Sequence, residues 1–329
     1  MKTILNHLFE HKTLTKEEAK EVLINISTAK YNISQVAAFM SVYLMRSITV
    51  DELDGFREAM RELCLRIDMN GYETIDLCGT GGDAKNTFNI STLASFIVAG
   101  AGIKVTKHGN YGVSSACGSS NVLEFLGVKF SNDEGFLKKC IENTGFCFLH
   151  APLFNPAMKF VAPIRKELGV KTFFNMLGPL ANPVNLKFQF VGVYNLELVR
   201  LFSYLMQKHD KRYVIIHSLD GYDEISLTDK FKVFTTDYED IVSPEAIGFK
   251  RNKPEDIYGG LSVESAAKIF VDIISGNGTQ AQNNTVIVNA AFAIMCAKPE
   301  LALSDAIEVA RESLISGKAR NVLEKVVKM

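Results

Sequence analysis

The spacing of apolar residues changes character near residue 70, which predicts two parts of different class. Before that point, apolar residues recur at helical spacing. The clearest set follows Ser34, a candidate N-cap, and comprises Val36, Phe39, Met40, Tyr43 and Leu44. Two further stretches, Thr15-Lys-Glu-Glu18 and Thr49-Val-Asp-Glu52, fit the capping box that begins many helices. We therefore expect residues 1–70 to form a small all-helical domain.

After residue 70, short apolar runs alternate with helical patterns. Strands are expected at residues 74–78, 103–106, 188–194 and 213–217. Helices are expected at residues 91–101 and 262–275, the second ending at Gly276 as its C-cap. This alternation predicts an α/β domain over residues 71–329, with a central, mostly parallel sheet flanked by helices. A segment near residues 160–185, within a less regular proline-containing stretch, is expected to join the helical domain.

The composition is that of a globular protein and excludes several classes. Of the 329 residues, 47% are apolar and 22% are charged, which excludes a disordered chain, a fibrous repeat and a disulfide-stapled miniprotein. The 36 basic and 37 acidic residues give a formal net charge of -1, which argues against a nucleic-acid or membrane-surface binder. The longest apolar stretches fall short of the ~18 residues that a membrane span needs.

Cysteine usage and the first residues give an expectation for the compartment. The six cysteines include no CxxC pair, so a structural zinc site is not expected, and free thiols fit a reducing compartment. Asn6 and His7 stand where a signal peptide would be apolar. We expect a soluble cytoplasmic protein with small-molecule substrates and with no nucleic-acid or membrane partner.

Gly79-Thr-Gly-Gly-Asp83 is the first of two glycine-rich turns, and it directly follows an expected strand. Asn89-Ile-Ser-Thr92 then begins a helix. Glycine lets backbone amides approach a ligand closely, and the free amides of a helix start favour a phosphate. The spacing matches neither the P-loop nor the dinucleotide-binding glycine pattern. Taken alone, such a turn is more often a plain strand-to-helix connection.

The second turn, Lys107-His-Gly-Asn110, follows the next expected strand and continues into Ser114-Ser115 and Gly118-Ser119. Ligands of open α/β sheets bind at the carboxyl ends of strands, where both turns fall. That agreement favours a phosphate or pyrophosphate site over a plain connection.

Asp223 and Glu224 are adjacent carboxylates in a non-helical segment after the strand expected at residues 213–217. In proteins, Mg²⁺ is usually bound by a few carboxylates together with substrate phosphates. The alternative, favoured for an isolated pair of this kind, is a solvated acidic loop.

These motifs occur in order along the chain, and together they resemble the signature of the anthranilate phosphoribosyltransferase family. The stretches Asn155-Pro-Ala-Met158, Val-Ala-Pro-Ile-Arg165 and Phe-Asn-Met-Leu-Gly-Pro179 belong to the same resemblance. It implies a nucleoside phosphorylase/phosphoribosyltransferase-like fold and a homodimer joined through the helical part. It also implies transfer of the phosphoribosyl group of phosphoribosyl pyrophosphate to the amine of anthranilate, releasing pyrophosphate, in tryptophan biosynthesis.

The resemblance assigns a role to each matching position. Phosphoribosyl pyrophosphate would be bound by Gly79, Gly82, Asp83, Thr87, Asn89, Ser91, Thr92, Lys107 and Ser119. Anthranilate would be bound by Gly79, His108, Asn110 and Arg165, the arginine pairing with its carboxylate. Mg²⁺, as two ions per subunit, would be bound by Ser91, Asp223 and Glu224. No dedicated acid or base is expected, because the aromatic amine is already neutral and needs positioning more than deprotonation.

Three positions depart from the family's commonest pattern. Asn155 stands where many members have histidine, Tyr111 where arginine is frequent, and Ser120-Asn121 where Ala-Asp is frequent. None of them belongs to the expected pyrophosphate or metal residues.

Two rival functions share this fold. A nucleoside phosphorylase would carry a different glycine turn and a longer C-terminal part. A nucleic-acid-binding relative would carry a basic surface and degraded metal and pyrophosphate motifs, whereas here the net charge is -1 and both acidic residues are present.

Overall fold

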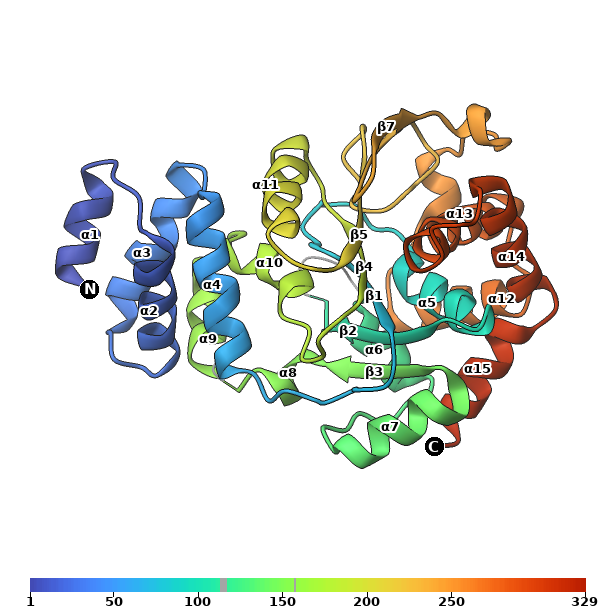
Figure 1. The fold of residues 1–329 in the computed structure, drawn as a ribbon, viewed down its shortest axis with the longest axis horizontal. Coiled ribbons are helices and arrows are strands. Elements are labelled where there is room, and N and C mark those ends of the chain that lie inside the picture. The colour runs from blue at the N-terminus through green and yellow to red at the C-terminus, as the bar shows by residue number, and fades with distance from the viewer. Residues whose placement is uncertain (113–116, 157) are drawn as a thin grey trace. The chain divides into compact units, whose positions relative to one another are not determined.

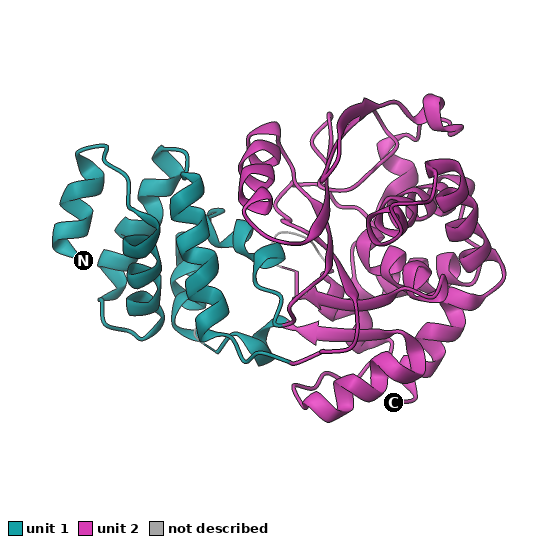
Figure 2. Ribbon diagram, viewed as in Figure 1, with its two compact units in different colours: residues 1–67, 151–183 teal, residues 68–150, 184–329 magenta. Residues whose placement is uncertain are grey.

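The computed structural model describes residues 1–112, 117–156 and 158–329, which form two compact units (Figure 2). Unit 1 comprises Met1–Ile67 and Ala151–Pro183, and unit 2 comprises Asp68–His150 and Val184–Met329. The sequence predicts a helical domain over residues 1–70, joined by a segment near residues 160–185, and an α/β domain over residues 71–329.

Unit 1 is built from helices. Its N-terminal part contains α1 (Lys2–Phe9), α2 (Lys16–Ser27), α3 (Ile33–Met45) and α4 (Val50–Leu63). Its second part contains α8 (Ala151–Phe154), α9 (Met158–Leu168), α10 (Phe174–Leu177) and the 3-10 helix η1 (Gly178–Leu180).

The starts of these helices follow the sequence closely. The capping boxes at Thr15 and Thr49 are confirmed, since each threonine and the glutamate three residues on hydrogen-bond each other's backbone N–H groups. The predicted cap Ser34 is wrong. Helix α3 begins after Asn32, whose Oδ1 accepts a hydrogen bond from the Gln35 N–H at 2.9 Å. Asparagine is at least as good an N-cap as serine, and here it stands two residues earlier.

A cluster of aromatic rings joins the second part of unit 1 to its N-terminal helices. The Phe173 ring stacks on Phe56 of α4, with 4.5 Å between ring centroids, and meets Phe39 and Tyr43 of α3 edge-on. Because aromatic side chains bury large apolar areas, these contacts explain why residues 151–183 pack with helices that precede them by about a hundred positions.

Unit 2 is built around a sheet with the strand order β3-β2-β1-β4-β5-β6-β7 (Figure 1). Its strands are β1 (Thr74–Gly79), β2 (Lys104–Gly109), β3 (Phe146–His150), β4 (Phe188–Gly192), β5 (Arg212–Ser218), β6 (Phe231–Thr235) and β7 (Glu239–Val242). The neighbours from β3 to β5 pair in parallel, whereas β6 and β7 pair antiparallel. The predicted mostly parallel sheet is confirmed.

Helices cover both faces of this sheet, as predicted. They are α5 (Ile90–Gly100), α6 (Ser119–Phe125), α7 (Glu134–Thr144), α11 (Leu196–Gln207), α12 (Val263–Ile274), α13 (Gln280–Ala297), α14 (Leu303–Ile315) and α15 (Lys318–Val327), with the 3-10 helices η2 (Pro244–Ile247) and η3 (Pro254–Ile257). Helix α5 packs against β1 and β2, and α13 against β4 and β5, while α11 covers β5 from the opposite face (Figure 1). Among the described residues, no helix is both long and apolar enough to cross a membrane.

The direction in which the chain fills the sheet reverses beside β1. From β1 the chain passes through α5 to β2 on one side, and from β4 it passes through α11 to β5 on the other side. The carboxyl ends of β1 and β4 are therefore neighbours, with Gly79 paired to Gly192. Such a reversal leaves room for a ligand beyond the carboxyl ends of the strands.

Candidate active site

Three segments that the sequence singles out meet at the carboxyl edge of the sheet in unit 2. In the first glycine turn, the Gly81 N–H donates a hydrogen bond to Asp223 Oδ2 at 2.6 Å. At the start of α5, the Ser91 N–H donates to Glu224 Oε1 at 3.2 Å. Both carboxylates are more than nine-tenths buried, so the alternative of a solvated acidic loop is wrong. The acidic pair is instead attached to the glycine turn and to the helix start.

The first glycine turn needs its glycines for backbone conformation. Gly81 and Gly82 have φ values of +65° and +80°, in the left-handed region that glycine adopts without steric cost. Ala84 also has a positive φ, +59°, although it carries a Cβ.

Two other glycines make room for Asp223. A Cβ built on Gly79 would lie 2.5 Å from Asp223 Oδ2, and one built on Gly192 would lie 1.6 Å from the Asp223 backbone oxygen. Gly79 was predicted to bind substrate, whereas Gly192 was not predicted to have a role. In the sequence, Gly192 is distinguished only as a glycine at the end of an apolar strand. Its contact with Asp223 joins residues far apart in the chain, so the sequence does not reveal it.

The start of α5 is left without a cap from its own side chain. Asn89 precedes the helix, but its Nδ2 donates to the Cys117 backbone oxygen at 3.1 Å instead of capping α5. This bond connects the start of α5 to the second glycine turn. The amides of a helix start favour an anion, and at this start the Ser91 N–H already donates to the Glu224 carboxylate.

Two predicted ligands of phosphoribosyl pyrophosphate are buried. The Thr92 side chain is 1% exposed and Lys107 is 2% exposed. The Lys107 Nζ donates to the Leu77 backbone oxygen and to Ser91 Oγ, the second at 3.5 Å. The Lys107 ammonium is thus buried and bonded to Leu77 and Ser91 in this structure. A direct contact between this ammonium and a ligand stays a prediction.

The remaining predicted ligands lie on the same edge of unit 2. Asp83 Oδ1 accepts a hydrogen bond from the Lys85 N–H at 3.0 Å, next to the acidic pair. Thr87 forms an isolated antiparallel bridge with Tyr258, which fixes the segment between the turn and α5.

The second glycine turn is closed by Asn121. Its Oδ1 accepts hydrogen bonds from the Gly112 N–H at 2.9 Å and the Gly118 N–H at 3.0 Å. These amides flank residues 113–116, and the predicted Ser114-Ser115 pair lies outside the described residues. Asn121 departs from the family's commonest residue, aspartate, yet its oxygen accepts both hydrogen bonds without a charge.

Ser119 and Ser120 connect this turn to the segment that follows β2. Both donate to the Asn110 backbone oxygen, Ser119 through Oγ at 3.4 Å and Ser120 through its N–H at 3.1 Å. The predicted residues Asn110 and Ser119 are therefore held side by side.

Tyr111 and Ser120, two departures from the common pattern, both contact His150 at the end of β3. Ser120 Oγ lies 2.8 Å from His150 Nδ1, and the Tyr111 ring meets the imidazole edge-on at 4.9 Å between centroids. The Tyr111 hydroxyl donates to Glu124 Oε1 at 3.1 Å. Burial lowers the pKa of His150, which keeps the imidazole neutral and able to hydrogen-bond with serine. Through these contacts, Tyr111 and Ser120 attach the second glycine turn to the end of β3.

The acidic residues repel one another in a poorly hydrated position. Burial raises the pKa of Asp223 well above its ordinary value, and the charges of Asp83 and Glu224 raise it further. Burial also raises the pKa of Asp83, and it raises that of Glu224 to about 7, although the Lys107 charge opposes the shift in Glu224. A bound cation would relieve this repulsion.

The arrangement fits Mg²⁺ bound together with a phosphate ligand. Within the described residues, no three histidine, cysteine, aspartate or glutamate side chains surround a single point, so the protein alone does not form a complete metal cage. Mg²⁺ often takes one or two carboxylates and completes its shell with water and substrate oxygens. Asp223, Glu224 and the Ser91 hydroxyl carry hard oxygen atoms of the kind that Mg²⁺ prefers.

The predicted anthranilate residues fall into both units. Gly79 ends β1, His108 lies in β2 with its N–H donating to Asp76 Oδ1 at 3.1 Å, and Asn110 follows β2. Arg165 lies on α9 of unit 1, in the last turn of that helix.

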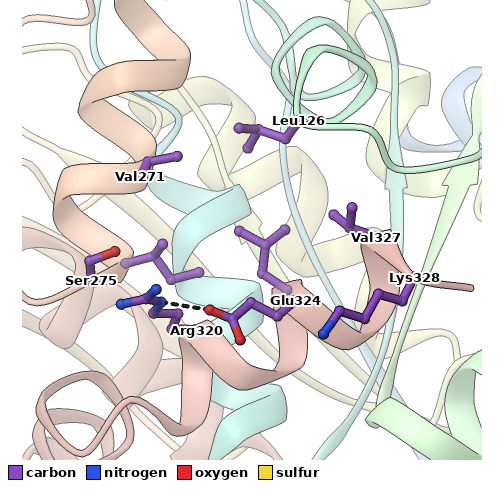
Figure 3. A pocket seen from close by; sticks show the side chains of 9 residues that line it. Leu126, Val271, Ser275, Arg320, Glu324, Val327 and Lys328 are labelled. Carbon is purple, nitrogen blue, oxygen red and sulfur yellow. Dashed lines mark hydrogen bonds and ion pairs between the residues drawn. The ribbon is translucent and has the colours of Figure 1, made fainter.

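A separate surface pocket of about 330 Å³ lies between α6, α12 and α15 (Figure 3). Leu126, Val271 and Leu323 contribute to its apolar floor, and Arg320 and Glu324 form an ion pair on its rim. None of the predicted site residues lines it, so this pocket is not the candidate active site.

Comparisons with known proteins agree with this picture. The family model described as "Glycosyl transferase family, a/b domain" matches residues 71–320, and the model described as "Glycosyl transferase family, helical bundle domain" matches residues 2–64. Anthranilate phosphoribosyltransferase from Flavobacterium johnsoniae is 60% identical over 326 residues, which are 99% of this chain and 98% of that protein. The chain belongs to the anthranilate phosphoribosyltransferase family.

Solved structures of this family have the same fold. The crystal structure of anthranilate phosphoribosyltransferase from Thermus thermophilus is 32% identical, with a TM-score of 0.92 over 98% of both chains. The Saccharomyces cerevisiae enzyme, solved in complex with PRPP and Mg, is 24% identical with a TM-score of 0.90, covering 98% of this chain and 96% of that one. At that identity, the second likeness is one of fold.

Replacing Gly192 with alanine tests whether the position of Asp223 matters for the site. A Cβ at Gly192 would collide with the Asp223 backbone, so the acidic segment must shift. We expect the affinity for Mg²⁺-pyrophosphate, measured by titration calorimetry, to fall at least about tenfold, equivalent to roughly 1.4 kcal/mol. The matched control is Gly135→Ala on α7, where a Cβ would meet only Asp133 Oδ1 at 3.4 Å. Equal affinities in the two variants would contradict the assignment.

The pKa of Glu224 predicts a pH dependence of stability. Its folded value of about 7 lies above the ordinary 4.5, so the folded chain retains a proton that the unfolded chain has lost. Ionisation of Glu224 therefore destabilises the metal-free protein progressively as the pH rises through that window. Glutamine cannot ionise, so we expect the melting temperature of Glu224→Gln minus that of wild type to become larger as the pH rises from 4.5 to 7. A difference in melting temperature that stays constant across this pH range would show that the pKa of Glu224 is not raised in the folded protein.

Proposed function

We propose that this chain transfers the phosphoribosyl group of phosphoribosyl pyrophosphate to the amine of anthranilate, giving N-(5-phosphoribosyl)anthranilate and pyrophosphate in tryptophan biosynthesis. Membership of the family supports the reaction. The observation that carries the proposal is the attachment of a buried acidic pair, Asp223 and Glu224, to a glycine turn and a helix start. Buried carboxylates held by the amides of a glycine turn and of a helix start suit a metal-bound pyrophosphate, and a solvated loop would not produce them.

For phosphoribosyl pyrophosphate we propose the binding residues that the sequence indicates. They belong to the two glycine turns, to the segment between the first turn and α5, and to the start of α5. They are Gly79, Gly82, Asp83, Thr87, Asn89, Ser91, Thr92, Lys107 and Ser119. Amides and hydroxyls fixed in place before the reaction stabilise charge on departing pyrophosphate better than mobile water does.

Ser91, Asp223 and Glu224 are the proposed ligands of Mg²⁺, with two ions per subunit. Mg²⁺, when bound with the substrate, neutralises the negative charge that builds up on the leaving pyrophosphate. The Gly81 and Ser91 amides hold the two carboxylates in place, and the Lys107 charge opposes the rise in the pKa of Glu224.

For anthranilate we propose Gly79, His108, Asn110 and Arg165. The guanidinium of Arg165 would pair with the substrate carboxylate, since the two planar groups match in geometry. The amine nitrogen forms a bond to ribose C1 as the bond from C1 to the pyrophosphate oxygen breaks, and the amine then loses a proton. We assign no general base to that proton, because a neutral aromatic amine attacks without prior deprotonation.

We also propose a homodimer joined through unit 1, located in the cytoplasm. Several apolar side chains are exposed on α1 and α3, including Phe9, Ile33, Leu44 and Met45, the last 87% exposed. Exposed apolar side chains gathered on two helices of one unit support an interface. All six cysteines are free thiols, which supports a reducing compartment.

Loss of anthranilate fluorescence tests the reaction directly. Purified chain with phosphoribosyl pyrophosphate, Mg²⁺ and anthranilate should consume anthranilate only when all three are present. Asp223→Asn with Glu224→Gln should lower kcat/KM at least about a hundredfold, equivalent to roughly 2.7 kcal/mol of transition-state stabilisation. The matched acid-to-amide control, Asp229→Asn, changes an exposed residue paired with Arg251 and should retain wild-type activity. Full activity in the double variant would refute the metal assignment.

Light scattering tests the dimer. We expect the wild-type mass to be twice 36.4 kDa, and Met45→Glu to shift the protein toward the monomer, because a buried unpaired carboxylate opposes association. Ile315→Glu in unit 2 is the matched control, since Ile315 is 70% exposed outside the proposed interface. A monomeric wild type would overturn the proposal.

A further inference from the structure

Arg165 differs from two other arginines of unit 1 in its polar contacts. Elsewhere in that unit, Arg46 pairs with Glu52, and Arg57 pairs with Asp54. Arg165 has no acidic partner among the described residues: its Nη2 donates to the neutral Asn175 Oδ1 at 3.2 Å, and its guanidinium lies 5.5 Å from the centroid of the Phe174 ring. The contacts orient the cation without neutralising it.

The chain reaches this arrangement through a tight return after α9. The Gly169 N–H donates to the Arg165 backbone oxygen at 3.2 Å, and Gly169 has a φ of +64°, which reverses the chain direction. Asn175 Oδ1 accepts a second hydrogen bond, from the Thr172 N–H at 3.2 Å. The Asn175 side chain is therefore held by backbone as well as by Arg165.

The aromatic side of the arrangement is fixed to the core of unit 1. The Phe174 ring stacks on Phe173, with 4.4 Å between centroids, and Phe173 stacks in turn on Phe56. Phe174 is 4% exposed, so its ring cannot turn away without disturbing that core. Arg165 thus lies between a rigid ring and a fixed amide.

A partly buried cation held in this way favours an anionic ligand. Burial lowers the pKa of Arg165, which reflects the loss of water around a charge with no counter-ion. One N–H of Arg165 Nη2 donates to Asn175 Oδ1, and the described residues provide no other hydrogen-bond acceptor for the guanidinium. Its other N–H donors suit the two oxygens of a planar carboxylate.

We propose that Asn175 and Phe174 are positioning residues that hold the Arg165 guanidinium in the orientation in which it pairs with the carboxylate of the amine substrate. The inference rests on the proposed function, because it takes anthranilate as the amine. Asn175 acts through Arg165 and does not itself react.

Steady-state kinetics on the full chain test the role of Asn175. In Asn175→Ala, the KM for anthranilate and the inhibition constant of benzoate, a carboxylate without the amine, should both rise about tenfold, the size expected for losing one hydrogen bond to a charged group. The KM for phosphoribosyl pyrophosphate should stay within about twofold, which a general loss of structure would not allow. Lys166→Ala, which removes an exposed neighbouring cation, should leave all three constants unchanged.

A second variant keeps the test decisive if the alanine variant is unstable. Asn175→Asp retains an acceptor for Arg165 and for the Thr172 N–H, so it should melt no lower than wild type. Its carboxylate cancels the Arg165 charge, and the inhibition constant of benzoate should rise at least tenfold. Wild-type benzoate binding in Asn175→Asp, or a parallel rise of all constants in Asn175→Ala, would overturn the inference. Absence of anthranilate turnover in wild type would instead refute the proposed function.

Discussion

The site depends on how Asp223 is accommodated at the end of a parallel sheet. Its carboxylate lies against Gly79 and accepts the Gly81 N–H, while its backbone lies against Gly192. Side chains on the two strand ends would exclude it from this place. The reversal of strand order beside β1 provides the space, and the glycines keep it open. The neighbouring Glu224 then reaches the start of α5, so that sheet, turn and helix meet at the acidic pair.

Much of the fold could be predicted because its signals are local. Thr15 and Thr49 cap their helices with the glutamate three residues on, and the run from Thr74 is a buried strand directly before a glycine turn. Each of these patterns lies within a few residues of the element that it specifies. The cap of α3 was assigned to Ser34 and not to Asn32 because both are polar residues close to the helix start, and the local pattern does not decide between them. The functional motifs were found because several of them occur together in order.

The remaining features arise from contacts that are distant in sequence. Gly192 matters because Asp223 lies against it, and Asn121 closes the second turn by bonding to amides on both sides of it. Asn175 is an ordinary residue until the return at Gly169 brings it to Arg165. The burial of Lys107 likewise follows from the packing of α5 on β1 and β2 and not from its own neighbours in the chain. Periodicity and motif spacing do not predict contacts between residues so far apart in the chain.

The most direct test of the account is the position of the metal when the substrate is bound. Crystals of the chain grown with phosphoribosyl pyrophosphate and Mn²⁺, a scattering substitute for Mg²⁺, would reveal the ion by its anomalous signal. We predict a peak about 2 Å from a carboxylate oxygen of Asp223 or Glu224 and from pyrophosphate oxygens. A peak whose ligands include neither carboxylate would contradict the claim that the buried acidic pair forms the metal site.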